Sequence, residues 1–219
     1  MQTIMMLNPN SSVRTTEAIA ASVAALPVSN EFAIAYQTLA AGPVAIESQA
    51  DFEVAARLVP DAVASANADA CVIACFADPG VSAARQRVDR PVLALAESSY
   101  RLALGLGRRF GIVSIVEPAV GRHARQLLEL ALEYALAGDR SVGLGLFGVH
   151  DEKALDKILA VARALRDVDG ADVIVLGCAS MGRHREAVEL ALGIPVIDAA
   201  QAAVTRAMSL LTLGYKRAA

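Results

Sequence analysis

The sequence predicts an α/β protein with two similar, pseudo-twofold-related lobes, each built on a mostly parallel sheet that helices cover. Three observations lead to this fold class. Short, nearly all-apolar runs alternate with longer amphipathic stretches, which is typical of a parallel sheet buried on both faces. The chain is 55% apolar and 20% charged, so it can bury a sizeable core. The two halves of the chain also repeat the same order of strand, cysteine and turn.

Strands are expected where a short apolar run is bounded by turn residues. In chain order the predicted strands cover residues 3–8, 31–38, 70–75, 91–96, 109–114, 141–147, 171–177 and 194–199. Between them, apolar residues recur at about every third or fourth position, which indicates helices. This pattern is clearest over residues 12–26, 48–67 and 150–168.

An internal repeat supports the division into two lobes. The segment ADACVIACFADPG, followed by RPVLALAES, matches the segment GADVIVLGCASMG, followed by IPVIDAAQ. Pro91 follows Cys75 at nearly the same spacing as Pro195 follows Cys178. We therefore predict lobes of residues 1–100 and 101–219 with an active-site cleft between them, at an approximate boundary that the C-terminal helix can cross.

Candidate catalytic residues lie where predicted strands end. In open parallel sheets, ligands bind beyond the carboxyl ends of the strands, where Asn8, Cys75, Ser114 and Cys178 stand. Free cysteine often only fills space, but two cysteines at equivalent points of a repeat favour a function. We expect their thiols to face one another across the cleft, with a gap for one flat ring and beyond the reach of a disulfide. Cys71 lies inside a strand without a counterpart and is expected in the core.

The turn after Cys75 bears on the acidity of its thiol. Asp78 is expected to cap the following helix and Pro79 to be its first residue. The free amides of a helix N-terminus lower a nearby thiol pKa, whereas the charge of Asp78 opposes this. We therefore expect no strongly depressed pKa for Cys75, and a thiol near neutrality would suit proton transfer.

Several other functions lack their sequence signals. The net charge is −3 with no basic run and no Trp, so nucleic acid is not an expected partner. Neither GxGxxG nor GxxxxGK[ST] occurs, which argues against dinucleotide and P-loop sites, and no grouping suggests a metal. A Cys–His nucleophile needs a nearby histidine, but His123, His150 and His184 are expected on a solvated surface.

The cellular setting is inferred from what the sequence lacks. The opening MQTIMML is expected to be the first strand rather than a signal peptide, and no apolar run is long enough to span a membrane. The odd number of cysteines does not suggest a disulfide framework. We expect free thiols and a cytoplasmic protein.

The chain resembles the Asp/Glu/hydantoin racemase superfamily over nearly its whole length, and most closely its hydantoin and allantoin racemase branch. The segments LNPNSS, AGPVAIES, CFADPG, RFGIVS, VIVLGCASM and IPVIDAAQAAV carry this resemblance in the family's order. It implies that Cys75 and Cys178 form a cofactor-independent acid–base pair and that the enzyme is a homo-oligomer. The substrate-binding residues it implies are Asn8, Asn10, Ser11, Ser12, Glu47, Phe76, Ser114, Ala179 and Ser180. Ser180 stands where the family pattern GCAGM has glycine, and SIVEPA replaces a more threonine-rich loop.

The implied activity is racemisation of a 5-monosubstituted hydantoin or a related cyclic ureide such as allantoin. One cysteine would take a proton from one face of the substrate and the other would give one to the opposite face. Three alternatives remain open at this point. They are a racemase of aspartate, glutamate or another amino acid, a cis–trans isomerase of a small diacid on the same scaffold, and a non-catalytic ligand-binding protein.

Overall fold

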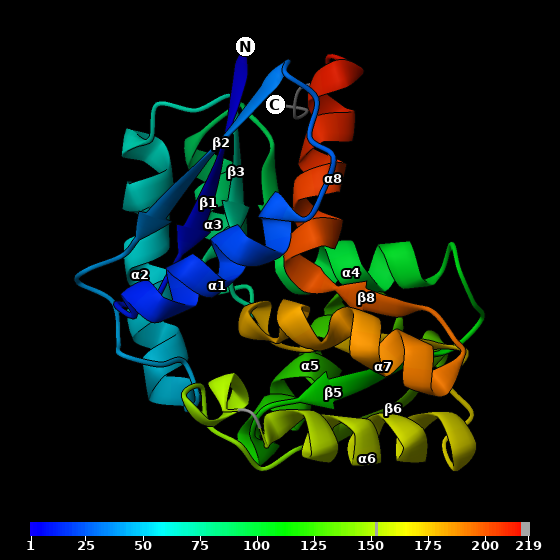
Figure 1. Cartoon of the computed structure of the whole chain (residues 1–219). Coiled ribbons are helices and arrows are strands. Elements are labelled where there is room, and N and C mark those ends of the chain that lie inside the picture. The colour runs from blue at the N-terminus through cyan, green and yellow to red at the C-terminus, as the bar shows by residue number, and fades with distance from the viewer. Residues whose placement is uncertain (152, 216–219) are drawn as a thin grey trace.

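The computed structural model describes residues 1–151 and 153–215, which form two parallel four-stranded sheets (Figure 1). The first has the order β2-β1-β3-β4 and the second the order β6-β5-β7-β8. The strands are β1 (Gln2–Asn8), β2 (Phe32–Thr38), β3 (Ala70–Ile73), β4 (Val92–Ala94), β5 (Phe110–Ser114), β6 (Leu136–Ser141), β7 (Val173–Leu176) and β8 (Val196–Asp198). The predicted α/β class with two similar sheets is confirmed.

Helices connect the strands and cover the sheets. The α-helices are α1 (Val13–Ala24), α2 (Gln49–Ser65), α3 (Val81–Arg87), α4 (Leu95–Ala103), α5 (Glu117–Glu129), α6 (Ala154–Asp167), α7 (Arg185–Leu192) and α8 (Ala199–Thr212). Three short 3-10 helices are η1 (Glu133–Ala135), η2 (Gly148–His150) and η3 (Ala179–His184). Within the described ranges, no helix combines the length and the apolar character that crossing a membrane requires.

Side chains alternate between two apolar layers along the strands, as the pleat of a strand dictates. Ile4 and Met6 of β1 face a central core, whereas Met5 and Leu7 face an outer layer with α2 and α3. In the second sheet, Ile112 faces the same central core, while its neighbours on the other face pack in an outer layer with α6 and α7. The two sheets therefore share one core between them.

Two helices bind the halves of the chain together. Helix α8, red in Figure 1, has Asp198 as its N-cap and packs against β1 and β3 of the first sheet. Helix α4 follows β4 directly and packs against β7 and β8 of the second sheet as well as against α8. Each of these helices thus packs against the sheet of the other half. This arrangement follows the internal repeat, because α4 and α8 occupy equivalent places after the last strand of each sheet.

The strand predicted over residues 141–147 is wrong. The sheet strand is β6, which ends at Ser141, and the apolar residues after it form a loop. Val142 and Leu146 are buried, but they cover the end of the second sheet instead of extending it. The edge strand β6 is polar and partly exposed, so its sequence lacks the apolar run that the prediction relied on.

The role predicted for Asp78 is also wrong. Helix α3 begins at Val81, and its N-cap is Gly80 with φ 71°. Asp78 itself has φ 51°, and its carboxylate accepts hydrogen bonds from the backbone N–H groups of Ala96 and Glu97 at 3.1 and 3.2 Å. Asp78 therefore caps α4, a helix that begins seventeen positions later in the chain, and Pro79 precedes α3.

Candidate active site

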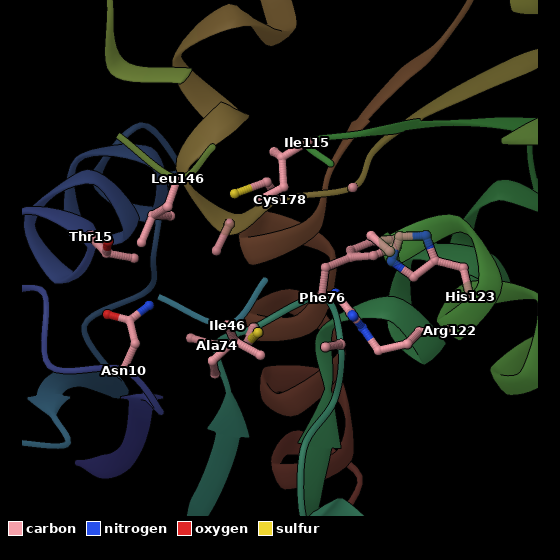
Figure 2. Close-up of a pocket in the computed structure, with 15 residues that line it drawn as sticks. Asn10, Thr15, Ile46, Ala74, Phe76, Ile115, Arg122, His123, Leu146 and Cys178 are labelled. Carbon is pink, nitrogen blue, oxygen red and sulfur yellow. The ribbon is translucent and has the colours of Figure 1, made fainter. Parts of the chain in front are cut away.

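The two strand-end cysteines line one cavity between the sheets (Figure 2). In this view Asn10 and Thr15 lie on one side of the cavity, and Arg122 and His123 lie on the opposite side. The cavity is small, with about 40 Å³ open to the centre of a water-sized sphere. Cys71 contributes nothing to it and is buried in the outer core of the first sheet.

Local backbone structure places each thiol. After β3 the chain turns tightly, since the N–H of Cys75 donates to the Ile73 carbonyl at 2.9 Å and the N–H of Asp78 donates to the Cys75 carbonyl at 3.0 Å. In the second sheet Gly177 separates β7 from Cys178. A Cβ atom at Gly177 would lie 2.8 Å from the Val113 carbonyl oxygen, so only glycine fits without a shift in the backbone.

Burial raises the pKa of both thiols above the usual value. The pKa of Cys75 is raised to about 12, mainly by burial and further by Cys178 and Asp78, while Arg122 and a hydrogen bond from the Ala77 amide oppose the shift. The pKa of Cys178 is raised to about 11 by burial and by Glu47, against the amide and hydroxyl of Ser180. The sequence predicts no strongly depressed pKa for Cys75, and the pKa is in fact raised. The near-neutral value that would suit proton transfer is not found at either thiol.

The NPNSS segment supplies one residue to the cavity wall. Asn8 is buried behind the wall, where its Nδ2 donates to Asn10 Oδ1, the Ser12 carbonyl and Thr16 Oγ1, each at 3.0 Å. The first of these bonds holds the Asn10 side chain, whose Oδ1 also accepts from the Ser12 N–H at 2.9 Å. With its oxygen so engaged, the Asn10 amide group lines the cavity and presents its Nδ2 as a donor (Figure 2).

Three other expected binding residues support the wall without lining it. Ser12 is the N-cap of α1 and accepts from the Thr15 N–H. The N–H of Ser11 donates to the Pro43 carbonyl at 2.9 Å. Glu47 accepts a hydrogen bond from the Leu146 N–H through Oε1, and its neighbour Ile46 is the lining residue.

Ser114 belongs to a buried cluster beneath the cavity. Its hydroxyl lies 3.2 Å from Nδ1 of His123 and donates to Asp139, and Nδ1 of His123 lies 2.8 Å from the Asp139 carboxylate. His123 lines the cavity and packs edge-on against Phe76. The surface position expected for the histidines is wrong, because His123, His150 and His184 are all buried.

The segments that follow the cysteines complete the wall. Phe76 and Ala179 both line the cavity. Ser180 is buried, and its hydroxyl has no hydrogen-bond partner among the described residues. Its backbone amide and hydroxyl nevertheless favour the Cys178 thiolate, because both lower the pKa of that thiol.

Several lining residues were not identified from the sequence. They are Thr15, Ile46, Ala74, Ala77, Ile115, Ala119, Arg122, His123, Leu146 and Gly177. Thr15 is the most informative, because it lines the cavity and its buried hydroxyl has no partner within the described chain. Its place in the first turn of α1, directly after the NPNSS segment, was the available signal. Among residues 1–151 and 153–215, no cluster of His, Cys, Asp and Glu is arranged as a metal site.

Comparison with known proteins identifies the family. Residues 4–207 match the family "Asp/Glu/Hydantoin racemase". The chain is 36% identical to a hydantoin racemase of Paenarthrobacter aurescens over 220 aligned positions, which cover 97% of this chain and 92% of that protein.

Solved structures agree with this match. An allantoin racemase from Klebsiella pneumoniae superposes with a TM-score of 0.94 at 30% identity, covering 100% of this chain and 91% of that one. A glutamate racemase from Francisella tularensis shares the fold, with a TM-score of 0.67 at 17% identity over 97% of this chain and 82% of that one. The chain belongs to the Asp/Glu/hydantoin racemase family.

Proposed function

We propose that this protein is a cofactor-independent racemase of a 5-monosubstituted hydantoin or a related cyclic ureide such as allantoin. The observation that carries the proposal is the presence of two strand-end thiols, Cys75 and Cys178, in the wall of one small cavity. The similarity to hydantoin and allantoin racemases over nearly the whole chain supports the choice of substrate class.

The reaction moves a proton on a carbon next to a carbonyl group. One cysteine, as the thiolate, removes the proton from one face and leaves an enolate-like anion. The other, as the thiol, returns a proton to the opposite face, and the reverse reaction exchanges the two roles. The ring carbonyls already acidify the carbon, so the side chains described here can carry the proton transfers.

Polar groups in the wall fit the developing oxyanion. On one side of the cavity Asn10 presents its amide Nδ2 as a donor, and Thr15 beside it carries a hydroxyl without a partner among the described residues (Figure 2). A preorganised donor of this kind contributes about 3–4 kcal/mol to transition-state stabilisation. The apolar remainder, including Ile46, Ile115 and Leu146, excludes water and strengthens these interactions.

The raised thiol pKa values are consistent with this chemistry. A carbon acid is weak, so a thiolate of high basicity is a suitable base for it. The cost is that little thiolate is present at neutral pH, since the pKa values of Cys75 and Cys178 are about 12 and about 11. Donors that favour either thiolate therefore raise the active fraction.

The test uses pure enantiomers of a 5-monosubstituted hydantoin and of allantoin in deuterium oxide, followed by polarimetry and proton NMR. We expect loss of optical rotation together with deuterium incorporation at C5, and neither with a Cys75→Ser/Cys178→Ser control. Parallel incubations use aspartate, glutamate and a small cis-diacid. Racemisation of an amino acid alone, or a covalent adduct with the diacid in mass spectra, would replace the proposal, and no turnover of any compound would indicate a binding protein.

A further inference from the structure

Arg122 is a buried cation in the wall that holds the two thiols. Its exposed fraction is 6%, and it lines both this cavity and a neighbouring groove between α2, α3 and α5. One guanidinium nitrogen, Nη1, donates to the Glu47 carbonyl at 3.1 Å. Its Nε is buried without a hydrogen-bond partner in the described part of the chain. No carboxylate of the described residues lies within ion-pair distance of Arg122.

A guanidinium in this setting is incompletely compensated. Burying a charge is costly unless an opposite charge and hydrogen bonds accompany it, and the single bond to a carbonyl leaves most of the five donors of Arg122 available. The anion that this cavity can itself generate is a cysteine thiolate. Helix α5, which carries Arg122, contacts the turn after Cys75, since Gln126 Nε2 donates to the Ala77 carbonyl at 2.8 Å. Of the two cysteines, Cys75 is also the one whose ionisation Arg122 favours.

We propose that Arg122 is a positioning residue that acts through Cys75, as the fixed counter-cation of its thiolate. This inference rests on the proposed function only for its catalytic consequence, because the ionisation of Cys75 can be measured without substrate. Figure 2 shows Arg122 reaching from α5 toward the cavity below Phe76. Its bond to the Glu47 carbonyl fixes the guanidinium from a second element.

The charged groups around the two thiols explain why Cys75 needs a cation. Burial, Cys178 and Asp78 all raise the pKa of Cys75, whereas the Ala77 amide and Arg122 lower it. Burial lowers the pKa of Arg122, and so does the cation of Arg125, whereas Cys75 and the carboxylate of Asp51 raise it.

Cys178 has a different environment. The amide and hydroxyl of Ser180 favour its thiolate and Glu47 opposes it, with no cation among the groups that act on it. A two-thiol racemase needs both singly ionised forms, because each enantiomer is attacked by a different thiolate. Arg122 therefore partly offsets the larger rise in the pKa of Cys75 and increases the fraction of Cys75 that is ionised.

The test measures thiolate reactivity one cysteine at a time. Iodoacetamide is uncharged and alkylates the thiolate, so its rate at pH 8 reports the ionised fraction. Mass spectrometry would follow alkylation of Cys75 in a Cys71→Ala/Cys178→Ser protein and of Cys178 in a Cys71→Ala/Cys75→Ser protein, each with and without Arg122→Met. We expect Arg122→Met to slow alkylation of Cys75 about tenfold, which corresponds to a rise of about one pKa unit, and to change that of Cys178 about twofold or less.

Two further variants separate charge from structure. Arg122→Lys retains the cation and should restore most of the Cys75 rate, whereas the exposed Arg125→Met, one turn away on α5, should leave it nearly unchanged. Equal slowing of both cysteines, an unchanged Cys75 rate, or no rescue by lysine would overturn the inference. Each of these results is independent of hydantoin turnover, so the inference and the proposed function can fail separately.

Discussion

Glu47 Oε1 accepts a hydrogen bond of 2.6 Å from the backbone N–H of Leu146, which lies 99 residues later in the chain. The bond lies at the cavity wall, because Leu146 and the neighbour of Glu47, Ile46, are lining residues. The bond therefore fixes the loop after β6 against the loop that precedes α2. The same carboxylate raises the pKa of Cys178 by its charge, so Glu47 combines a structural contact with an electrostatic effect.

Two substitutions at Glu47 should separate these effects. Glu47→Gln keeps an acceptor for the Leu146 N–H and removes the charge, so the pKa of Cys178 should fall and its alkylation by iodoacetamide at pH 8 should become several-fold faster. Glu47→Ala also removes the charge but frees the loop, so we expect KM to rise as well, by about tenfold or more for the loss of one hydrogen bond to a charged group.

The two variants are compared in their kinetic constants and in the alkylation rate of Cys178. Steady-state kinetics would give KM and kcat for each, and the alkylation rate would report the thiol. A Glu47→Gln protein with the wild-type alkylation rate would mean that the carboxylate does not act on Cys178. Identical KM values for the two variants would mean that the bond to Leu146 does not shape the cavity.

The position of the cysteines could be predicted from the sequence because strand ends are visible there. The apolar runs before Cys75 and Cys178 end at turn residues, and the parallel topology brings such ends to one edge. The loop after β6 could not be predicted in the same way. Its residues are apolar because Leu146 covers the cavity, and a short apolar run in a loop has the same composition as a buried strand.

Partners distant in the chain account for the other differences. Asp78 precedes a helix and has the composition of a cap, but its hydrogen bonds go to the start of α4. His123 has polar neighbours in sequence, yet it is buried against Asp139 and Phe76. In each case the local sequence allows two placements of the side chain, and contacts with residues distant in the chain determine which one is adopted.

Thr15 should contribute to substrate binding. Thr15→Val has nearly the same shape and loses a hydroxyl that has no partner among the described residues. We expect kcat/KM to fall about tenfold, for one lost hydrogen bond, with the free energy of unfolding close to wild type. Thr16→Val is the matched control, since its hydroxyl bonds to Asn8 and Thr38 and its loss should reduce stability as well. An unchanged kcat/KM for Thr15→Val would place the substrate elsewhere.

Asp78 makes stability depend on pH. Burial raises its pKa to about 7, against the hydrogen bonds from Ala96 and Glu97. Between about pH 4 and pH 7 the folded protein holds a proton that the unfolded chain has lost, so this contribution to the free energy of unfolding falls as pH rises through that window. An asparagine does not titrate. We therefore expect Asp78→Asn to gain about 2–4 kcal/mol relative to wild type between pH 4 and pH 8.

Urea unfolding at pH 4.5 and pH 8 would measure this change. The relevant quantity is the difference between variant and wild type at each pH, because the loss of one backbone contact can shift both values by the same amount. Asp156→Asn, an exposed position in the first turn of α6, serves as the control. If the free energy of unfolding of the variant differs from that of wild type by the same amount at pH 4.5 and pH 8, Asp78 titrates as an ordinary exposed carboxyl group.

Cys71 should have a structural role only. Its side chain is fully buried in β3 among Met5, Val59 and Val92, so Cys71→Ala leaves a small cavity and should cost about 1–2 kcal/mol of stability. Turnover per folded molecule should remain near wild type, as measured by racemase activity normalised to native protein from circular dichroism. A well-folded Cys71→Ala protein without activity would mean that this thiol takes part in the reaction.

The last prediction concerns the division of work between Cys75 and Cys178. Each of Cys75→Ser and Cys178→Ser should abolish racemisation, because a full cycle needs both a base and an acid. A serine hydroxyl is a far poorer base than a thiolate, but the remaining cysteine can still remove the proton that it faces. Each variant should therefore retain slow exchange of hydrogen for deuterium, with retention of configuration, on one enantiomer only.

The two variants should prefer opposite enantiomers, because in the proposed mechanism their remaining thiols act on opposite faces of the bound ring. Proton NMR of each pure enantiomer in deuterium oxide would show the loss of the C5 proton signal, and polarimetry would show whether configuration is kept. Exchange of the same enantiomer by both variants would require both thiols to act on one face. Racemisation at a near wild-type rate by either variant would require a different second base, and in both cases the paired-cysteine mechanism would be wrong.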